Sequence, residues 1–142
     1  MDLPGRVPVF AAALWWGSLT AIGFVAVPLV FANLPSPAIA GPVAARLFSA
    51  QTWMSLVCGI VLLAAMRSRM ALDGLGGVLA GMLLALLQEF AVAPRIVAKQ
   101  DLALWHSIGS GMYLAQWACA AVVLWRVSPR ASSPTSSSAS TS

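Results

Sequence analysis

Three ionisable side chains lie inside long apolar stretches of this sequence, where such groups are rare and mark ligand sites, ion paths or proton relays. They are the carboxyl group of Glu89, the imidazole of His106 and the guanidinium of Arg46. An imidazole changes its charge near neutral pH, and a buried carboxyl group readily takes up a proton. Together with Arg95, and beside the kink that Pro94 predicts, these residues are typical of a proton or ligand site.

A structural interpretation of the same residues is slightly favoured. Because a carboxylate buried without a partner is unstable, we expect Glu89 to pair with Arg46 or Arg95, with His106 beside them. In that case the charges hold the helices together and bind nothing. Both hypotheses remain open from the sequence.

A second set of residues recurs at helical spacing in the last apolar stretch. His106, Ser110, Tyr113 and Trp117 share one face of a helix, and we expect this face to look inward. Ser110 and Tyr113 would then extend the ligand or proton site below His106 as a hydrogen-bonded column. Alternatively, these side chains satisfy one another in the core.

Catalysis and cofactor binding have little support. The chain has a single histidine, and the nearest soft ligands, Met54, Met112 and Cys58, are not at a recognised metal or haem spacing. There is no G-x-S-x-G sequence, no phosphate-binding glycine motif and no glycosidase-type carboxylate pair. We therefore expect no enzyme, no metal and no cofactor, and a haem or copper protein is the least supported alternative.

The composition excludes a water-soluble domain. Of 142 residues, 60% are hydrophobic and 8% are charged, whereas soluble domains carry about 25% charged residues. The mean hydropathy is +0.87. The net charge of +4 comes from basic residues that stand singly or in pairs at the ends of apolar stretches, so the chain lacks the basic face that nucleic-acid binding requires.

Four apolar stretches are each long enough to cross a membrane, which takes about 20 residues. The predicted spans are 8–33, 43–66, 74–93 and 102–126. Turn formers between residues 33 and 42 separate the first two spans, and Pro28 and Pro94 are expected to kink the first and third helices. Short connections favour antiparallel neighbours, so the predicted fold is an all-α, antiparallel bundle of four transmembrane helices.

This bundle is expected to occupy residues 1–126, followed by a tail. Ser and Thr make up 10 of the residues in 127–142, so the tail has no apolar surface to bury and is predicted to be disordered. Within the bundle, small residues should let helices approach closely. The glycines expected to do so are Gly17, Gly77, Gly81, Gly109 and Gly111.

Four spans place both termini on one side of the membrane. Five basic residues lie on that side, namely Arg6, Arg67, Arg69, Arg126 and Arg130. Three lie on the other, namely Arg46, Arg95 and Lys99. The positive-inside rule then puts both termini in the cytoplasm, and the membrane is expected to be a bacterial inner membrane. The unusual polar residues gather at the outer end, which also receives Gln51, Gln88 and Asp101.

The chain resembles a known family through several short motifs. These are the run GSLTAIGFVAVPLVF, Ala40-Gly41, Leu47-Phe48, Ala93-Pro94-Arg95-Ile96 and His106-Ser107. Over residues 8–126 it is similar to the bacterial domain of unknown function 4149, which is related to eukaryotic transmembrane protein 205. The resemblance implies a four-helix membrane protein without an assigned activity. It supports Pro28, Pro94 and His106 through their motifs, and Arg46 and Arg95 as further positions to test, whereas Glu89 is proposed from physical chemistry alone.

Three functional hypotheses follow. The first is a non-enzymatic membrane protein whose polar cluster binds a small ligand, an ion or a proton. The second is a structural or assembly subunit that contacts a second copy of the chain or another membrane protein within the bilayer. The third is the haem or copper protein. Nucleic acid is not an expected partner of any of them.

Overall fold

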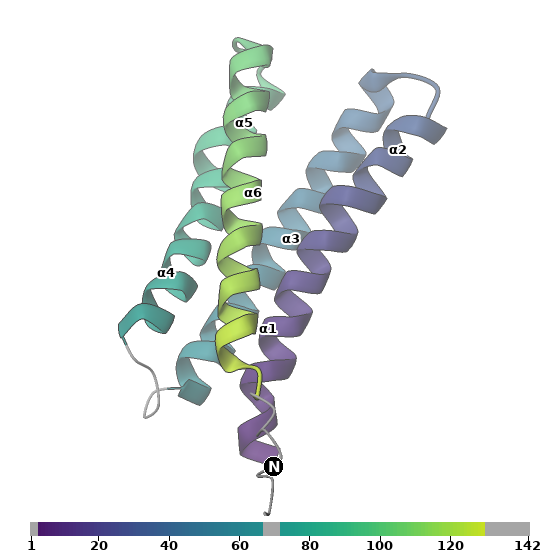
Figure 1. The fold of residues 1–142 in the computed structure, drawn as a ribbon. Helices are drawn as coiled ribbons and strands as arrows, with labels where there is room; N and C mark the ends of the chain where they lie inside the picture. Colours follow the sequence, from purple (N-terminus) through teal and green to yellow (C-terminus); the bar gives the residue numbers. More distant parts are fainter. Residues whose placement is uncertain (1–2, 67–71, 130–142) are drawn as a thin grey trace, which may run out of the picture.

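The computed structural model describes residues 3–66 and 72–129, and nearly all of them are helical (Figure 1). The chain folds into an antiparallel bundle of four helical rods, each long and apolar enough to cross a membrane, which confirms the predicted fold. The four candidate spans are Arg6–Asn33, Pro37–Ala65, Gly74–Val97 and Leu102–Val127. The predicted disordered tail falls, from residue 130 onward, outside the described residues.

Two of the rods are interrupted by π-helical segments. The first rod consists of α1 (Leu3–Ala21), η1 (Ile22–Ala26) and α2 (Val27–Asn33). The third consists of α4 (Leu72–Leu87), η2 (Gln88–Val92) and α5 (Ala93–Val97). The second and fourth rods are single α-helices, α3 (Pro37–Met66) and α6 (Leu102–Val127).

The prolines explain both interruptions. Proline has no backbone N–H and therefore cannot continue an α-helical hydrogen-bond ladder. In each rod the π segment ends two residues before the proline, and a new α-helix restarts with Pro28 or Pro94 in its first turn. An N–H is not required in the first turn of a helix. The third rod therefore continues to Val97, beyond the expected end at residue 93.

The second rod begins earlier than the sequence suggested, at Pro37 in place of residue 43. Pro37 occupies the first position of α3, where a proline is favoured, and the Ser36 carbonyl accepts hydrogen bonds from the N–H groups of Ile39 and Ala40 at 3.1 and 3.0 Å. Pro42 follows in the second turn, and the helix runs through it. The sequence predicts a turn through residues 37–42 because a proline at the start of a helix and a proline in a turn look alike in sequence.

The two halves of the chain repeat one another. The π segments are offset by 66 residues (88 − 22 = 66), and so are the prolines that follow them (94 − 28 = 66). In space, α1 packs against α3 and α6, and α4 packs in turn against α6 and α3. The bundle therefore consists of two similar hairpins related by a pseudo-two-fold arrangement.

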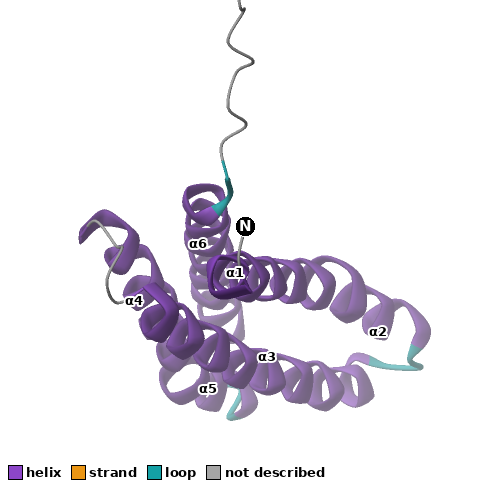
Figure 2. Ribbon diagram, turned by 90° about the horizontal axis from the view of Figure 1, so that it is seen from below, coloured by secondary structure: helices purple, strands orange, loops and turns teal. Residues whose placement is uncertain are grey.

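The hairpins are packed together at one end and separate at the other. The core is built around Trp15 and Leu19 of α1, Leu62 of α3, Val78 of α4 and Val123 of α6, all buried. Toward the turns that follow α2 and α5, the pair α2–α3 diverges from the pair α5–α6 in both views (Figures 1 and 2). The two π segments lie where the divergence begins.

Close packing depends on some of the expected glycines. A Cβ atom on Gly81 would lie 2.5 Å from Cη2 of Trp15, and one on Gly77 would lie 3.1 Å from Val123. Gly109 is similarly close to Val92. Gly17 and Gly111, in contrast, face open space, so the expectation was wrong for these two.

Candidate functional site

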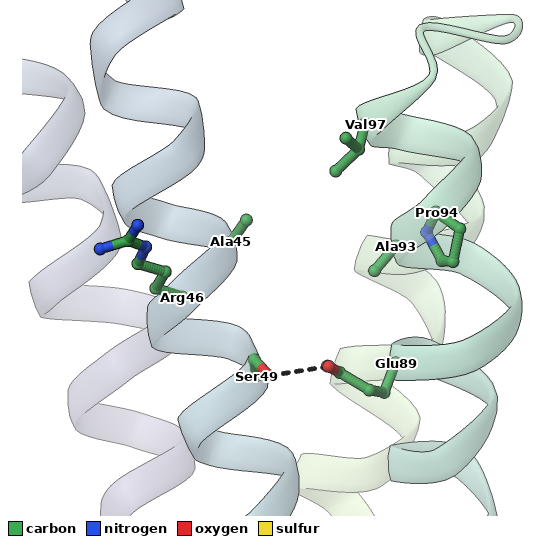
Figure 3. A pocket seen from close by; sticks show the side chains of 7 residues that line it. All are labelled: Ala45, Arg46, Ser49, Glu89, Ala93, Pro94 and Val97. Atoms are coloured by element: carbon green, nitrogen blue, oxygen red, sulfur yellow. Dashed lines mark hydrogen bonds between the residues drawn. The ribbon is translucent and has the colours of Figure 1, made fainter.

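Glu89 lies in η2, at the level where the two hairpins begin to separate. Its Oε1 atom accepts a hydrogen bond from the Ser49 hydroxyl of α3 at 2.7 Å, across the gap between the rods (Figure 3). The side chain is half-buried. It is the only glutamate in the sequence, and the three aspartates, Asp2, Asp73 and Asp101, lie outside the candidate spans. Glu89 is thus the one acidic side chain inside the four spans.

A pocket of about 350 Å³ surrounds this hydrogen bond. α3 forms one wall, and η2 and α5 form the other. The lining residues are Ala45, Arg46, Ser49, Glu89, Ala93, Pro94 and Val97. Glu89 and Ser49 point toward one another across the gap, and the remaining wall on the side of α5 is apolar (Figure 3).

The expected ion pair of Glu89 is not formed within the described residues. Arg46 lines the pocket, but its guanidinium is directed away from Glu89, to the other side of α3 (Figure 3). Arg95 is exposed and turns back on its own rod, donating to the Ala91 carbonyl. Its guanidinium carbon also lies 4.6 Å from the centre of the Trp105 ring, a cation–π contact between α5 and α6.

His106 and Ser110 do not join this site, which corrects the expectation that they face inward. Both are exposed. The buried positions of α6 include Gly109, Tyr113 and Gln116, and Ser110 lies about 100° around the helix from Gly109. By its spacing, His106 continues the line of buried positions on α6. It is exposed because it lies one turn into α6, where the hairpins have separated and only α5 and η2 lie beside the helix.

Tyr113 faces inward as expected, but it forms a hydrogen bond with the first rod and not with His106. Its hydroxyl donates to the Leu19 carbonyl of α1 at 2.7 Å, and its ring packs edge-on against Phe48 at a centroid distance of 5.3 Å. A side chain on Gly23 would collide with the Tyr113 ring. Gly23 is the position in the first repeat that corresponds to Glu89 (89 − 23 = 66).

A second polar group lies deeper, and most of it was not expected from the sequence. The Ser55 hydroxyl accepts hydrogen bonds from the side-chain amides of Gln51 and Gln116 at 3.2 and 2.9 Å. The Gln51 amide also donates to the Ser18 hydroxyl at 3.1 Å. All three of Gln51, Ser55 and Gln116 are at most 3% exposed, so this amide cluster joins α1, α3 and α6 inside the bundle.

A signal for this cluster was present in the sequence. Gln51 and Gln116 each follow an alanine and lie three residues after an aromatic residue, Phe48 or Tyr113. These pairs are offset by 65 residues (116 − 51 = 65 and 113 − 48 = 65), one fewer than the π segments and prolines. They meet in space, the glutamines at Ser55 and the aromatic rings with each other. The Oε1 atom of Gln51 is buried and has no partner among the described residues.

Neither polar group resembles a metal centre. The described part of the chain contains no group of three or more His, Cys, Asp or Glu side chains that could hold a metal ion. The pocket offers a carboxylate and a hydroxyl, and the amide cluster offers two amides and two hydroxyls. Both arrangements suit hydrogen-bonding or charged ligands better than a transition metal.

A comparison with protein families gives a match over most of the chain. The model of a domain of unknown function, DUF4149, matches residues 10–104. This range includes both π segments and the pocket, together with the first residues of α6. No curated protein and no solved structure matches the chain.

Proposed function

The chain belongs to the DUF4149 family of unknown function, and we propose that it is a non-enzymatic, multi-pass membrane protein that binds a proton or a small cationic ligand at Glu89. That the chain is a multi-pass membrane protein is supported by four helices that are long and apolar enough to cross a membrane. That it binds a proton or a cation is supported by the chemistry of the Glu89 side chain. Intramembrane carboxyl groups are costly, and they are retained most often where they handle protons, ions or ligands.

The observation that carries the proposal is that the Glu89 carboxylate is accessible and only partly hydrogen-bonded. A carboxylate has about four lone-pair positions for hydrogen-bond donors, and Ser49 occupies one of them. The side chain lines an open pocket, and no arginine neutralises it within the described residues. A carboxyl group that is half-buried, incompletely bonded and accessible is suited to reversible binding.

The depth of the site supports the same conclusion. Glu89 is eight residues from the end of its span at Val97 (97 − 89 = 8), which corresponds to about 12 Å along a helix. The hydrocarbon core of a bilayer is about 30 Å thick. This distance places the carboxyl group within the apolar layer, where ionisable side chains are rare and mark sites for ions, protons or ligands.

A hydrophobic carbodiimide tests this proposal, because it partitions into membranes and modifies protonated carboxyl groups. In vesicles that contain the full chain, we expect labelling at Glu89, measured by mass spectrometry of the intact protein, to slow as the pH is raised. The Glu89→Gln variant is the control and should not be labelled within the spans. An unreactive Glu89, or a labelling rate that is independent of pH, would contradict the proposal.

The second functional hypothesis is a structural or assembly subunit. The Ser49–Glu89 hydrogen bond favours it, because this bond joins the two hairpins where few other contacts hold them. On this hypothesis the carboxyl group holds α3 and η2 together and binds no ligand. Ready labelling of Glu89 supports the first hypothesis, and an unreactive Glu89 supports the second.

A further inference from the structure

The charge that faces the pocket is negative. Among its lining residues only Glu89 and Arg46 are charged, and the Arg46 guanidinium is turned away to the other side of α3 (Figure 3). The Ser49 hydroxyl adds a neutral dipole beside the carboxylate. The pocket therefore favours a positively charged ligand.

The oxygen atoms of the pocket are too few to coordinate a bare metal cation. Ca²⁺ and Mg²⁺ take about six to eight oxygen ligands, whereas the side chains here supply one carboxylate and one hydroxyl. A hydrated inorganic ion would also have to leave water to reach this depth, which is costly. An organic cation needs no such coordination shell.

The remaining lining is apolar and suits the body of an organic molecule. Ala45 on α3 and Ala93 on α5 are small, which keeps the gap between the rods open, and Pro94 and Val97 form its outer edge. Val97 is 70% exposed. The volume of about 350 Å³ belongs to an open groove, in which the apolar body of a ligand stays partly exposed.

The position of the opening indicates the route of entry. Pro94 and Val97 lie within a membrane span and are exposed, so in the bilayer their outer surfaces contact lipid. Ser49 is twelve residues from the start of its span at Pro37 (49 − 37 = 12), about 18 Å along the helix. A ligand dissolved in the membrane reaches the carboxylate sideways, between α3 and α5.

We propose that this pocket binds a monovalent organic cation whose charge pairs with Glu89 and whose apolar body lies against Ala45, Ala93, Pro94 and Val97. The inference rests on the proposed function and deepens it by naming the ligand class.

Two ions of nearly identical shape and opposite charge provide the test. The dipole potential of a bilayer favours anions, so tetraphenylborate enters the membrane more readily than tetraphenylphosphonium. Protection by the cation alone therefore reports charge and not partitioning. In vesicles that contain the full chain, tetraphenylphosphonium, or the smaller phenylethylammonium, should slow carbodiimide labelling of Glu89. Tetraphenylborate and sodium chloride should leave the rate unchanged.

Direct binding gives a second measurement that does not depend on labelling. Saturable binding of radiolabelled tetraphenylphosphonium to purified protein in nanodiscs should disappear in Glu89→Gln and weaken in Ala93→Leu, which fills the pocket. Ala118→Leu is the matched control, because Ala118 is exposed on α6 and does not line the pocket. Size-exclusion chromatography verifies that each variant is folded.

The outcomes separate this inference from the proposed function. If Glu89 is labelled in a pH-dependent manner but neither cation protects it, the carboxyl group handles protons only, and the ligand inference is wrong. Protection by sodium chloride alone would indicate an inorganic cation and would also overturn the inference. If Glu89 is not labelled and wild-type protein and Glu89→Gln bind the cation equally, both proposals fail.

Discussion

At the scale of single residues, the hydrogen bond between Ser49 and Glu89 is the most informative contact of the molecule. It is the link between α3 and η2 at the level where the hairpins separate. A hydrogen bond to a charged group contributes about 1.5–3 kcal/mol to stability, and one between neutral side chains in a membrane contributes about 0.6 kcal/mol. Its energy thus depends on whether the carboxyl group is ionised.

A double-mutant cycle measures this contact. We expect Ser49→Ala and Glu89→Gln each to lower the free energy of unfolding, with a coupling energy of about 0.5–2 kcal/mol. The effects of substitutions at two residues in direct contact are not additive. Reversible unfolding of the purified protein in mixed detergent micelles provides the free energies.

The matched cycle combines Glu89→Gln with Arg46→Gln. Because the Arg46 guanidinium is turned away from the carboxylate, these two changes should add to within about 0.5 kcal/mol. Strong coupling in this second cycle, with none in the first, would show that Glu89 pairs with Arg46 as the sequence had suggested.

The sequence identified the unusual residue but not its partner. Glu89 was recognised because a carboxyl group within an apolar stretch is rare. Its partner depends on how each helix is rotated, and the rods are apolar on all sides, so no hydrophobic stripe fixes that rotation in advance. Gln51 and Gln116 were overlooked as a pair because their contact follows from the repeat and not from their local sequence.

At the scale of elements, the two π segments decide where the polar side chains point. A π turn inserts one extra residue into an α-helix, and each residue of an α-helix turns the chain by about 100°. Everything that follows η2 is thereby rotated relative to α4. The number of rods and their approximate limits could be predicted from apolar length, whereas the π segments could not, because a proline alone indicates a kink, a break or a bulge.

Substitution of Pro94 tests the role of η2. In Pro94→Ala, the new N–H group can bond to the Phe90 carbonyl, so an unbroken α-helix through Gln88–Val92 becomes available. We expect Glu89 to turn out of the pocket and its carbodiimide labelling to slow, while the protein remains folded. Mass spectrometry of the labelled protein gives the rate.

The repeat supplies the control for this substitution. Pro28→Ala makes the same backbone change next to η1, which has no carboxyl group, and should leave the labelling of Glu89 unchanged. Equal rates in Pro94→Ala and in the wild-type protein would mean that η2 does not orient Glu89.

At the scale of the whole molecule, the proposed orientation in the membrane rests on a small charge difference. The sequence predicts five basic residues on the side of both termini and three on the opposite side. Following the positive-inside rule, we propose that both termini face the cytoplasm and that the turns after α2 and α5 face outward. A bacterial inner membrane is the proposed location.

The single lysine of the chain makes this orientation measurable. Lys99 lies in the turn after α5 and is exposed, at the end of the bundle opposite the N-terminus (Figure 1). A membrane-impermeant amine reagent should therefore label Lys99 in intact spheroplasts, and the terminal amine only in inverted vesicles. Lys99→Arg is the control that identifies the labelled site. The reverse pattern would invert the proposed topology.

The separation of the two hairpins gives the molecule a wedge shape along the axis of the bundle. Its cross-section is larger at the end with α2 and α5 than at the tightly packed end (Figures 1 and 2). In a bilayer, we expect lateral pressure around this wider end to push the hairpins together, and the pocket lies between them. The curvature and lipid packing of the host membrane are therefore expected to change the space beside Glu89.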